Sequence, residues 1–298
     1  MNNKKANIII VSPSGAIDPT YIDGAQKVLT QWGYNVSVSP NAKGKYGRFS
    51  ATDRKRISDL QQAINNPTFN IILCARGGYG LSRIIDKIDF SPLIGTDRLI
   101  VGFSDITAIH NALGNLGVKS IHAPMAKHIA TECDSPAVWE LKKCLEGKTL
   151  HYTFKNMELN RKGKATGRLI GGNLSMIYAL RGTKFDLNYD GAILFIEDVG
   201  ERLYHIDRMM QNLRLGGVFN KIKGLIVGQF TLCDVDDSFP DGAYGVIANA
   251  VKGYRFPVAL NFSSGHIDNN NMPLMLGANY TLNVPELPNK VILDQITD

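Results

Sequence analysis

Cysteine is scarce in this sequence, and no two cysteines stand close together. The chain of 298 residues has four of them, Cys74, Cys133, Cys144 and Cys233, and lacks a Cys-x-x-Cys pair. A structural zinc site needs closely spaced thiolates, and a disulfide framework needs more cysteines in a shorter chain. Neither is expected here, and a reducing compartment fits this cysteine usage best.

Long apolar runs are also absent. No stretch approaches the roughly 18 to 20 apolar residues that a membrane helix needs. Near the N-terminus, the apolar run 6–11 is shorter than the core of a signal peptide and ends in the turn-forming residues Ser12-Pro13-Ser14-Gly15. We therefore expect a cytoplasmic protein that binds no membrane.

The excess of charge of one sign is small. The 33 Lys and Arg residues against 27 Asp and Glu residues give a formal net charge of +6, and the basic residues occur in short clusters such as Arg54-Lys55-Arg56. Proteins that bind nucleic acid usually concentrate their basic residues on one face or segment. No nucleic-acid partner is expected.

Three motifs that would indicate a cofactor are missing. The sequence has no complete Gly-x-x-x-x-Gly-Lys-Ser/Thr phosphate loop, no Gly-x-Gly-x-x-Gly dinucleotide fingerprint and no His-Glu-x-x-His metal pair. It therefore predicts neither a bound nucleotide nor a catalytic metal, and we expect no cofactor.

Short apolar segments alternate with longer amphipathic ones along the first half of the chain. Short β-branched runs suit buried strands, and the longer runs have the apolar spacing of helices. The expected strands are 7–11, 34–38, 69–74, 99–102 and 119–121, and the expected helices are 19–32, 51–65, 81–88 and 105–116. Such βα repetition predicts a parallel sheet with helices on both faces.

The composition changes near residue 150. The segment 147–168 is polar and contains several Lys and Gly residues, as is typical of a connection between domains. Beyond it we expect helices at 173–180, 203–213 and 241–251, strands at 192–196 and 224–228, and several short strands after Pro257. The predicted fold class is α/β, with a parallel-sheet domain over 1–148, a linker over 149–166 and a mixed α/β domain over 167–298.

Ser104 follows the strand 99–102 at the turn into the next helix. Ligands of parallel sheets bind at the carboxyl ends of the strands. A turn there would lift the hydroxyl out of the sheet and bring it near free amides at the helix N-terminus, as in a nucleophile elbow. The alternative is a helix cap, because Ser and Asp are ordinary N-cap residues and the second glycine of Gly-x-Ser-x-Gly is absent.

A glycine-rich loop, Arg76-Gly77-Gly78-Tyr79-Gly80, follows the strand 69–74. Its glycines allow backbone amides to approach an anionic group, and the forked guanidinium of Arg76 suits a carboxylate. We therefore expect Arg76 and Gly77 to bind substrate, with Arg76 holding a carboxylate. The alternative is a tight turn that only needs glycine dihedrals.

Glu197 directly follows the apolar run 192–196, so its carboxylate is expected to be buried and to need a partner. A structural ion pair with Arg202 or Arg208 would satisfy it without any role in catalysis. Asp198 and Glu201 are rival candidates, but both lie farther from the expected strand end, and we expect them to be solvated.

His266 lies in the turn-like run Ser264-Gly265-His266, where an imidazole would face a cleft. Together with Ser104 and Glu197 it completes the minimum set for acyl transfer, because a histidine takes the hydroxyl proton and an acid orients the histidine. The three residues are far apart in the sequence, so only a fold that joins both domains would assemble them. By themselves, these residues also fit a non-catalytic protein that binds a small anion.

Five motifs follow one another along nearly the whole chain. They are Ala75-Arg76-Gly77-Gly78-Tyr79-Gly80, Gly102-Phe103-Ser104-Asp105, Leu169-Ile170-Gly171-Gly172-Asn173-Leu174, Leu194-Phe195-Ile196-Glu197-Asp198 and Gly265-His266. In this order they resemble the motif series of the LD-carboxypeptidase family of serine peptidases. Five ordered motifs are far more specific than any one of them.

The resemblance implies a flavodoxin-like N-terminal domain that carries the nucleophile Ser104 and a mixed α/β C-terminal domain that carries the acid Glu197 and the base His266. It also implies an oxyanion hole built from the backbone amides of Gly78 and Asp105. Members of the family typically act as homodimers, and the best known remove the terminal D-alanine from murein tetrapeptide in the cytoplasm during cell-wall recycling. A murein peptide substrate and a homodimer are therefore expected.

The motif series departs from the family pattern after the base. Many relatives have Gly-His-Gly where this chain has Gly265-His266-Ile267, and the missing glycine could alter the approach of the base. A branch of the family cleaves peptidyl nucleotides of the microcin C type and grips the nucleotide base with a long aromatic loop. Here the two tryptophans, Trp32 and Trp139, lie far from the strand ends of the second domain, which favours murein peptide.

Overall fold

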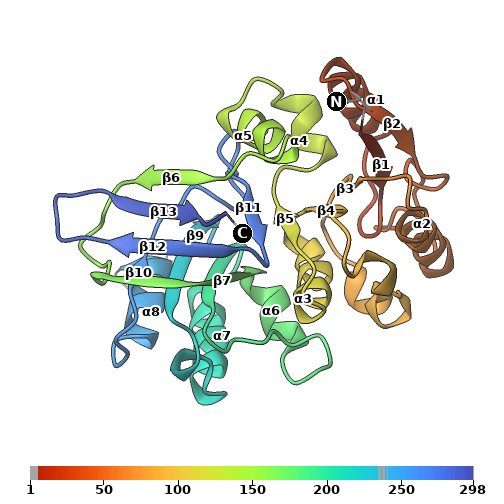
Figure 1. Ribbon diagram of the computed structural model, residues 1–298. Helices are drawn as coiled ribbons and strands as arrows, with labels where there is room; N and C mark the ends of the chain where they lie inside the picture. Colours follow the sequence, from red (N-terminus) through yellow and green to blue (C-terminus); the bar gives the residue numbers. More distant parts are fainter. Residues whose placement is uncertain (1–5, 234–235, 237–238, 240, 298) are drawn as a thin grey trace. The chain divides into compact units, whose positions relative to one another are not determined.

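The computed structural model describes residues 6–233, 236, 239 and 241–297, which form two compact units (Figure 1). The first unit comprises residues 1–145 and 268–274, and the second comprises 146–267 and 275–298. Each unit is built around its own β-sheet with helices packed on it. The α/β fold class predicted from the alternation of apolar segments is confirmed.

Parallel strands form the sheet of the first unit, in the order β5-β4-β3-β1-β2. They are β1 (Asn7–Val11), β2 (Asn35–Val38), β3 (Ile71–Cys74), β4 (Leu99–Gly102) and β5 (Ser120–His122). The next strand in the order after β5 is β11 (Leu274–Leu276), which begins at the last residue of the segment 268–274. All of β3 and all but the first residue of β1 are buried, as expected for inner strands of a parallel sheet.

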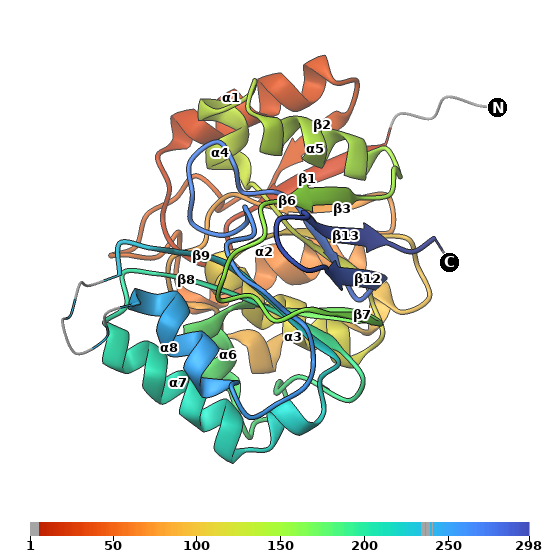
Figure 2. The same cartoon turned by 90° about the vertical axis from the view of Figure 1, so that its left-hand side faces the viewer.

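The α-helices of the first unit are α1 (Pro19–Gln31), α2 (Asp53–Asn65), α3 (Thr107–Asn115), α4 (Ala126–Thr131) and α5 (Pro136–Leu145). Helices α1 and α4 lie side by side (Figure 2). They pack so closely that a Cβ at Gly24 would be 2.8 Å from the Cβ of Ala130. The sequence did not predict α4 and α5, because α4 is too short to show helical periodicity.

The helix expected over 81–88 is not an α-helix. This segment forms two 3₁₀ turns, η1 (Leu81–Arg83) and η2 (Ile85–Lys87), and a third, η3 (Ser91–Leu93), follows. Gly80 precedes them with φ +142°, and Ile84 between them departs from helical geometry, so no continuous helix forms. The helix expected from residue 105 begins with a 3₁₀ turn, η4 (Ser104–Ile106), before α3.

The second unit has a mixed sheet in the order β10-β9-β8-β7-β12-β13-β6. Its parallel part contains β7 (Gly163–Asn173), β8 (Ile193–Val199), β9 (Gly224–Thr231) and β10 (Val258–Ala259). Its antiparallel part adds β6 (His151–Phe154), β12 (Asn279–Val284) and β13 (Val291–Gln295). The segment 149–166, expected to be a linker, therefore contributes β6 and the first part of β7. One face of these strands is exposed and therefore carries polar residues. A polar composition is also typical of linkers, which is why the sequence indicated one.

Helices α6 (Leu174–Leu180), α7 (Leu203–Leu215) and α8 (Gly242–Ala250) lie on the same side of β7 to β10, with the 3₁₀ turn η5 (Val218–Asn220) after α7 (Figure 1). Apolar residues of these helices and strands form one buried cluster. This cluster fixes β8 and β9 in the middle of the parallel part, where the acid predicted from the sequence lies.

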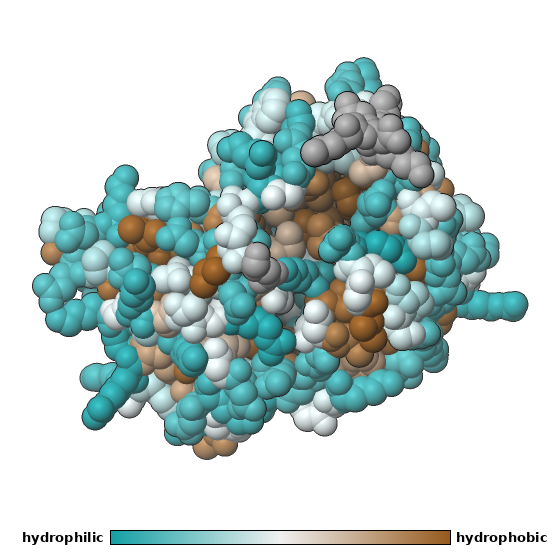
Figure 3. Space-filling model, in the orientation of Figure 1, coloured by the Kyte–Doolittle hydropathy of each residue, from teal (hydrophilic) through white to brown (hydrophobic). Residues whose placement is uncertain are grey.

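Hydrophilic residues cover most of the molecular face shown in Figure 3, and hydrophobic residues appear there in separate patches. Across the described ranges, no helix is both long enough and apolar enough to cross a membrane.

Candidate active site

Ser104 lies in a strained turn between β4 and α3. Its φ is +65°, a left-handed conformation that costs a residue other than glycine on the order of 1 kcal/mol or more and persists only where the surroundings impose it. The residue that caps η4 is Phe103, the one that caps α3 is Ile106, and neither helix start has a side-chain capping bond. The alternative in which Ser104 only caps a helix is therefore wrong, and the strand, strained turn and helix have the arrangement of a nucleophile elbow.

The glycine-rich loop after β3 touches this serine. A Cβ at Gly77 would lie 2.8 Å from the Cβ and 3.0 Å from the Oγ of Ser104, so only glycine fits. Gly78 follows with φ +103°, and the described part of the chain offers its N–H no hydrogen-bond acceptor. Asp105 lies in the first turn of η4, where N–H groups have no partner within the helix. Ser104, Gly77, Gly78 and Asp105 are thus brought together within the first unit.

The side chain of Asp105 connects two loops beside Ser104. Its Oδ2 accepts hydrogen bonds from the Ser14 hydroxyl and, at 2.9 Å, from the Leu81 N–H. Burial raises the pKa of this carboxyl group, and these hydrogen bonds oppose the rise. From the sequence, only the backbone amide of Asp105 is expected to take part. The turn-forming run around Ser14, at the end of the first strand, was the available signal.

A buried arginine holds the same two loops from the other side. Arg56 is 1% exposed, and its Nη1 donates to the carbonyl oxygens of Pro13 and, at 3.1 Å, Gly80. Its Nη2 donates to Asp53 at 2.7 Å. The sequence placed Arg56 in a basic cluster without a specific role. In the structure it fixes the far end of the glycine-rich loop.

Arg76 is exposed at the start of this loop. Its Nη1 donates to the Ala16 carbonyl oxygen at 2.7 Å, which holds the guanidinium in place. No ion pair neutralises Arg76 within the described residues. Its charge is therefore available to an anionic ligand, as the sequence predicts for a carboxylate.

In the second unit, Glu197 and His266 form a hydrogen-bonded pair. Glu197 is fully buried within β8, and its Oε2 accepts a hydrogen bond from Nδ1 of His266 at 2.7 Å. The partner of Glu197 is thus the histidine, and the arginine ion pair considered from the sequence is absent among the described contacts. With the proton on Nδ1, the other ring nitrogen, Nε2, is the one that can accept a proton.

Burial and charge act in opposite directions on His266. Burial by itself lowers the pKa of the imidazole, and the attraction and hydrogen bond of Glu197 outweigh it, so that the pKa is raised above its usual value. A histidine held in this way is oriented by its acid and is a stronger base than an isolated buried imidazole.

The backbone on both sides of His266 explains the residues found there. Gly265 has φ +122°, and a Cβ on it would lie 2.8 Å from Glu197 Oε2, so glycine is required. Ile267 donates its N–H to the Gly265 carbonyl oxygen at 2.9 Å and does not have a positive φ. The position at which many relatives have glycine therefore needs no glycine dihedrals in this chain.

Asp198 is buried, and the expectation that it would be solvated is wrong. Strand β8 runs to Val199, two residues beyond Glu197, so Asp198 belongs to the strand. Its carboxylate accepts hydrogen bonds from the Asn173 side chain at 2.9 Å and the Ser175 N–H at 2.8 Å. Burial, followed by the charge of Glu197, raises the pKa of Asp198 to about 6. Its role is to fix the start of α6.

The remaining titratable groups of the described residues form no metal site. Among the described residues, no three His, Cys, Asp or Glu side chains are grouped so that they could hold a metal ion. His110 of α3 is buried with its Nδ1 2.8 Å from Ser120 Oγ and its Nε2 2.8 Å from the Gly102 carbonyl oxygen, which makes it a structural residue behind β4.

Comparison with known proteins identifies the family. The model of the LD-carboxypeptidase N-terminal domain matches residues 8–123, and that of the C-terminal domain matches residues 166–282. A Bacillus subtilis protein named "Probable murein peptide carboxypeptidase" is 33% identical over 78% of this chain and 74% of its own length. The chain belongs to the LD-carboxypeptidase family. It is therefore a hydrolase of the serine carboxypeptidase type.

Other members of the LD-carboxypeptidase family agree over most of the chain. The murein tetrapeptide carboxypeptidase of Pseudomonas aeruginosa is 26% identical, with 87% of both chains covered. The crystal structure of muramoyltetrapeptide carboxypeptidase from Oxalobacter formigenes superposes with a TM-score of 0.88 at 27% identity, covering 98% of this chain and 99% of that one. The microcin C7 self-immunity protein MccF of Escherichia coli is 26% identical over 77% of this chain and 76% of its own length.

Proposed function

We propose that this LD-carboxypeptidase family member hydrolyses the peptide bond to the terminal D-alanine of murein tetrapeptide, with Ser104 as nucleophile, His266 as base and Glu197 as the acid that orients the base. The observation that carries the proposal is the buried pair of Glu197 and His266. A fully buried carboxylate that bonds only the Nδ1 side of a half-buried imidazole is the acid–base arrangement of a serine hydrolase.

In the proposed reaction, His266 Nε2 takes the proton of the Ser104 hydroxyl while Ser104 Oγ attacks the carbonyl carbon at the L-centre of diaminopimelate. The bond from this carbon to the D-alanine nitrogen breaks, and His266 gives its proton to the leaving amine. Water, activated by the same histidine, then hydrolyses the acyl-enzyme and releases a tripeptide. Glu197 stabilises the positive charge that His266 carries in each half of the reaction.

The backbone amides of Gly78 and Asp105 form the oxyanion hole in this proposal. The Gly78 N–H has no acceptor within the described chain, and Asp105 begins η4. Amides held in place before the reaction stabilise a developing oxyanion without having to reorganise. The hydrogen bonds of Asp105 to Leu81 and of Arg56 to Gly80, at the C-terminal end of this loop, support such rigidity.

Arg76, with Gly77, binds the free carboxylate of the terminal D-alanine in this proposal. A charge-assisted contact of this kind distinguishes a carboxypeptidase from an endopeptidase, because an internal peptide residue has no carboxylate to offer. The absence of an ion-pair partner for Arg76 among the described residues supports this role.

The test is incubation with murein tetrapeptide followed by mass spectrometry. Loss of one alanine is expected with the native protein and not with Ser104→Ala or His266→Ala. His151→Ala is the matched control, because His151 is exposed and bonds Asp294 at the β6 edge of the second sheet, away from β8. A fluorophosphonate probe should label the native protein and not Ser104→Ala. If the probe failed to label correctly folded native protein, that result would favour the interpretation that the protein only binds a small anion.

A peptidyl nucleotide of the microcin C type serves as the second substrate in the same assay. Both tryptophans of this chain lie in the first unit, Trp32 at the end of α1 and Trp139 in α5. We therefore expect murein tetrapeptide to be cleaved with the higher kcat/KM. Faster cleavage of the peptidyl nucleotide would reverse this assignment.

We also propose that the enzyme works as a homodimer in the cytoplasm, where murein peptides are recycled. The basis is the behaviour typical of the family, together with the low cysteine content. Sedimentation equilibrium should give about twice the mass of one chain, and fractionation of cells should recover the protein with cytoplasmic markers. A monomer mass would remove the first part of this proposal, and recovery with membranes the second.

A further inference from the structure

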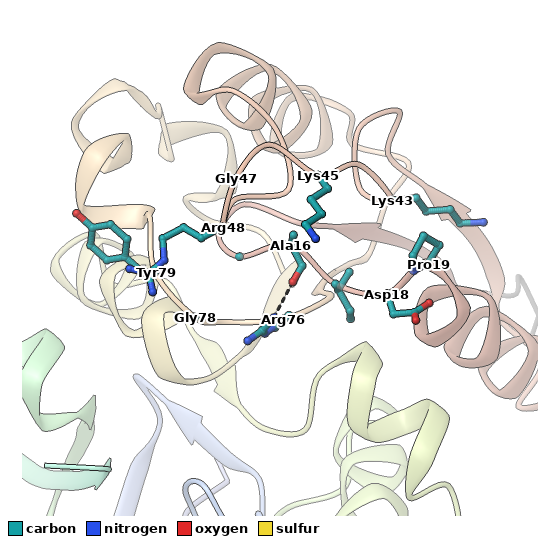
Figure 4. Close-up of a pocket in the computed structure, with 12 residues that line it drawn as sticks. Ala16, Asp18, Pro19, Lys43, Lys45, Gly47, Arg48, Arg76, Gly78 and Tyr79 are labelled. Atoms are coloured by element: carbon teal, nitrogen blue, oxygen red, sulfur yellow. Dashed lines mark hydrogen bonds between the residues drawn. The ribbon is translucent and has the colours of Figure 1, made fainter.

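A cavity with a volume of about 750 Å³ lies beside the glycine-rich loop of the first unit (Figure 4). Loops from three parts of the chain line it: the turn after β1, the segment around Lys45 and Arg48, and the start of the glycine-rich loop with Arg76 and Gly78. Cavities of about 300–1,000 Å³ hold ligands much larger than one alanine. The cavity therefore has room beyond what the proposed leaving group needs.

Positive charge dominates the lining. Lys45, Arg48 and Arg76 are exposed, and none has an ion-pair partner among the residues that the structure describes. The fourth cation, Lys43, is different because it pairs with Asp23. In Figure 4, Lys45 points toward Ala16 and Arg76, Arg48 extends toward Tyr79, and Lys43 points away from them.

The acidic residue in the lining, Asp18, forms no ion pair with these cations among the described residues. Asp18 caps α1, where its Oδ1 accepts hydrogen bonds from the Thr20 N–H at 2.9 Å and from the Thr20 hydroxyl at 2.7 Å. Three unpaired cations thus outnumber one unpaired carboxylate around a cavity that Gly15 and Ala16 also line. Such a lining attracts an anion more strongly than a single surface charge would.

Two of the cations are held by local contacts. The guanidinium of Arg48 lies over the ring of Tyr79, 5.6 Å from its centroid, and the Arg48 carbonyl oxygen accepts the Ala16 N–H at 2.9 Å. Arg76 bonds the Ala16 carbonyl oxygen. The guanidinium of Arg48 is thus held by Tyr79 and that of Arg76 by Ala16, which reduces the entropy lost when they bind an anion.

The position of the cavity indicates which part of a substrate would enter it. Gly78 and Arg76 belong both to the cavity and to the proposed active site, and Ser104 contacts Gly77 between them. If Arg76 takes the terminal carboxylate, the space next to Arg76 in this cavity lies on the side of the leaving amino acid. This step rests on the proposed function.

We propose that Lys45 and Arg48 form a subsite for a second negative charge on the leaving residue, so that the enzyme also releases terminal D-amino acids with an acidic side chain. The terminal carboxylate binds Arg76, and the side-chain carboxylate of a D-glutamate or D-aspartate reaches Lys45 and Arg48. Because these cations are exposed to solvent, each contributes modestly, and together they favour an acidic over an isosteric neutral residue about tenfold.

The experiment compares tetrapeptides that end in D-glutamate and in D-glutamine, which differ in charge and hardly in shape. For the native enzyme, kcat/KM should be about tenfold higher with D-glutamate, and the ratio should fall as salt is added. In the variant with both Lys45→Gln and Arg48→Gln, the ratio should fall to about 1. Lys43→Gln is the matched control and should keep the native ratio, because Lys43 is already paired.

Two results would overturn the subsite: equal rates for the two peptides with the native enzyme, or a preference for D-glutamate that persists in the double variant. Release of D-alanine from the ordinary tetrapeptide reports separately on the proposed function. Calorimetry with Ser104→Ala compares binding of the same two peptides without chemistry. Equal affinities there would contradict the subsite even if no peptide were cleaved.

Discussion

His266 donates from its Nδ1 to Oε2 of Glu197 across 2.7 Å, and Glu197 is completely shielded from solvent. The imidazole stabilises this buried carboxylate by donating a hydrogen bond to it. The pair thereby fixes both the orientation and the tautomer of the base. Changing the acid should therefore alter the acid–base behaviour of the enzyme as well as its rate.

Glu197→Gln should lower kcat by about 10²-fold or more, because the imidazolium loses its stabilising charge. The pH profile gives a second readout. Neutral His266 is the active base, so activity falls as pH drops through the pKa of His266, which Glu197 holds above its usual value. Without that charge, burial lowers this pKa, and the acidic limb of kcat/KM should move to lower pH. An unmoved limb would show that His266 is not the base.

Ser104→Gly should be more stable than Ser104→Ala by about 1 kcal/mol, although neither should release D-alanine. Glycine adopts the observed φ of +65° without strain, whereas alanine retains the strain of serine. Urea unfolding of both variants measures the difference. Equal stabilities would mean that the turn at residue 104 is not strained in solution.

Gly77→Ala should destabilise the protein by about 1–3 kcal/mol and reduce kcat sharply, since the new methyl group would lie 2.8 Å from the Ser104 Cβ. Gly114→Ala in α3 is the control. A Cβ there meets nothing within 4 Å, and alanine favours helix, so this variant should be as stable as the native protein or slightly more stable. Similar effects at both positions would contradict the close contact between Gly77 and Ser104.

Arg76→Gln should raise KM for tetrapeptide about 10- to 100-fold, which is the usual cost of losing a hydrogen bond to a charged group. The same variant should discriminate little between tetrapeptide and its C-terminal amide, whereas the native enzyme should strongly prefer the free carboxylate. Steady-state kinetics with both peptides provides the comparison. A KM that stays at the native value would remove Arg76 from substrate binding.

His110 should make the protein sensitive to acid. Burial lowers the pKa of this histidine from 6.5 to about 4, so the unfolded chain binds its proton at a higher pH than the folded chain does. Neutral His110 therefore contributes to the free energy of unfolding, fully above about pH 6.5. This contribution, about 3 kcal/mol in total, is lost as pH falls toward 4. His110→Gln should show a flatter decline of unfolding free energy over this range. Parallel curves would assign the acid sensitivity to other groups.

Local patterns in the sequence were sufficient for much of the fold and for the candidate site. The run 99–102 followed by Ser104 indicated a strand and a sharp turn, and the glycines after the strand 69–74 indicated a loop near it. These features depend on residues close together in the chain. The turn at Gly78 follows from the dihedral freedom of glycine and could be predicted locally, whereas the positive φ of Ser104 is imposed by its surroundings.

Contacts between distant segments could not be predicted in the same way. Asp105 bonds Ser14, and Glu197 bonds His266, in each case over many residues. Asp198 looked solvated because a polar residue after an apolar run is typical of a loop. The segment 149–166 looked like a linker because an exposed strand face is as polar as a loop.

The sequence by itself therefore determined most strands of the parallel sheets, the glycine turns and the candidate residues for acyl transfer. Tertiary structure decided which of those residues are partners and what surrounds them, including the buried pair in β8 and the unpaired cations beside the glycine-rich loop. The physical reason is that dihedral preferences act between neighbours in the chain. Burial, desolvation and the pairing of charges depend on which distant segments the folded core brings together.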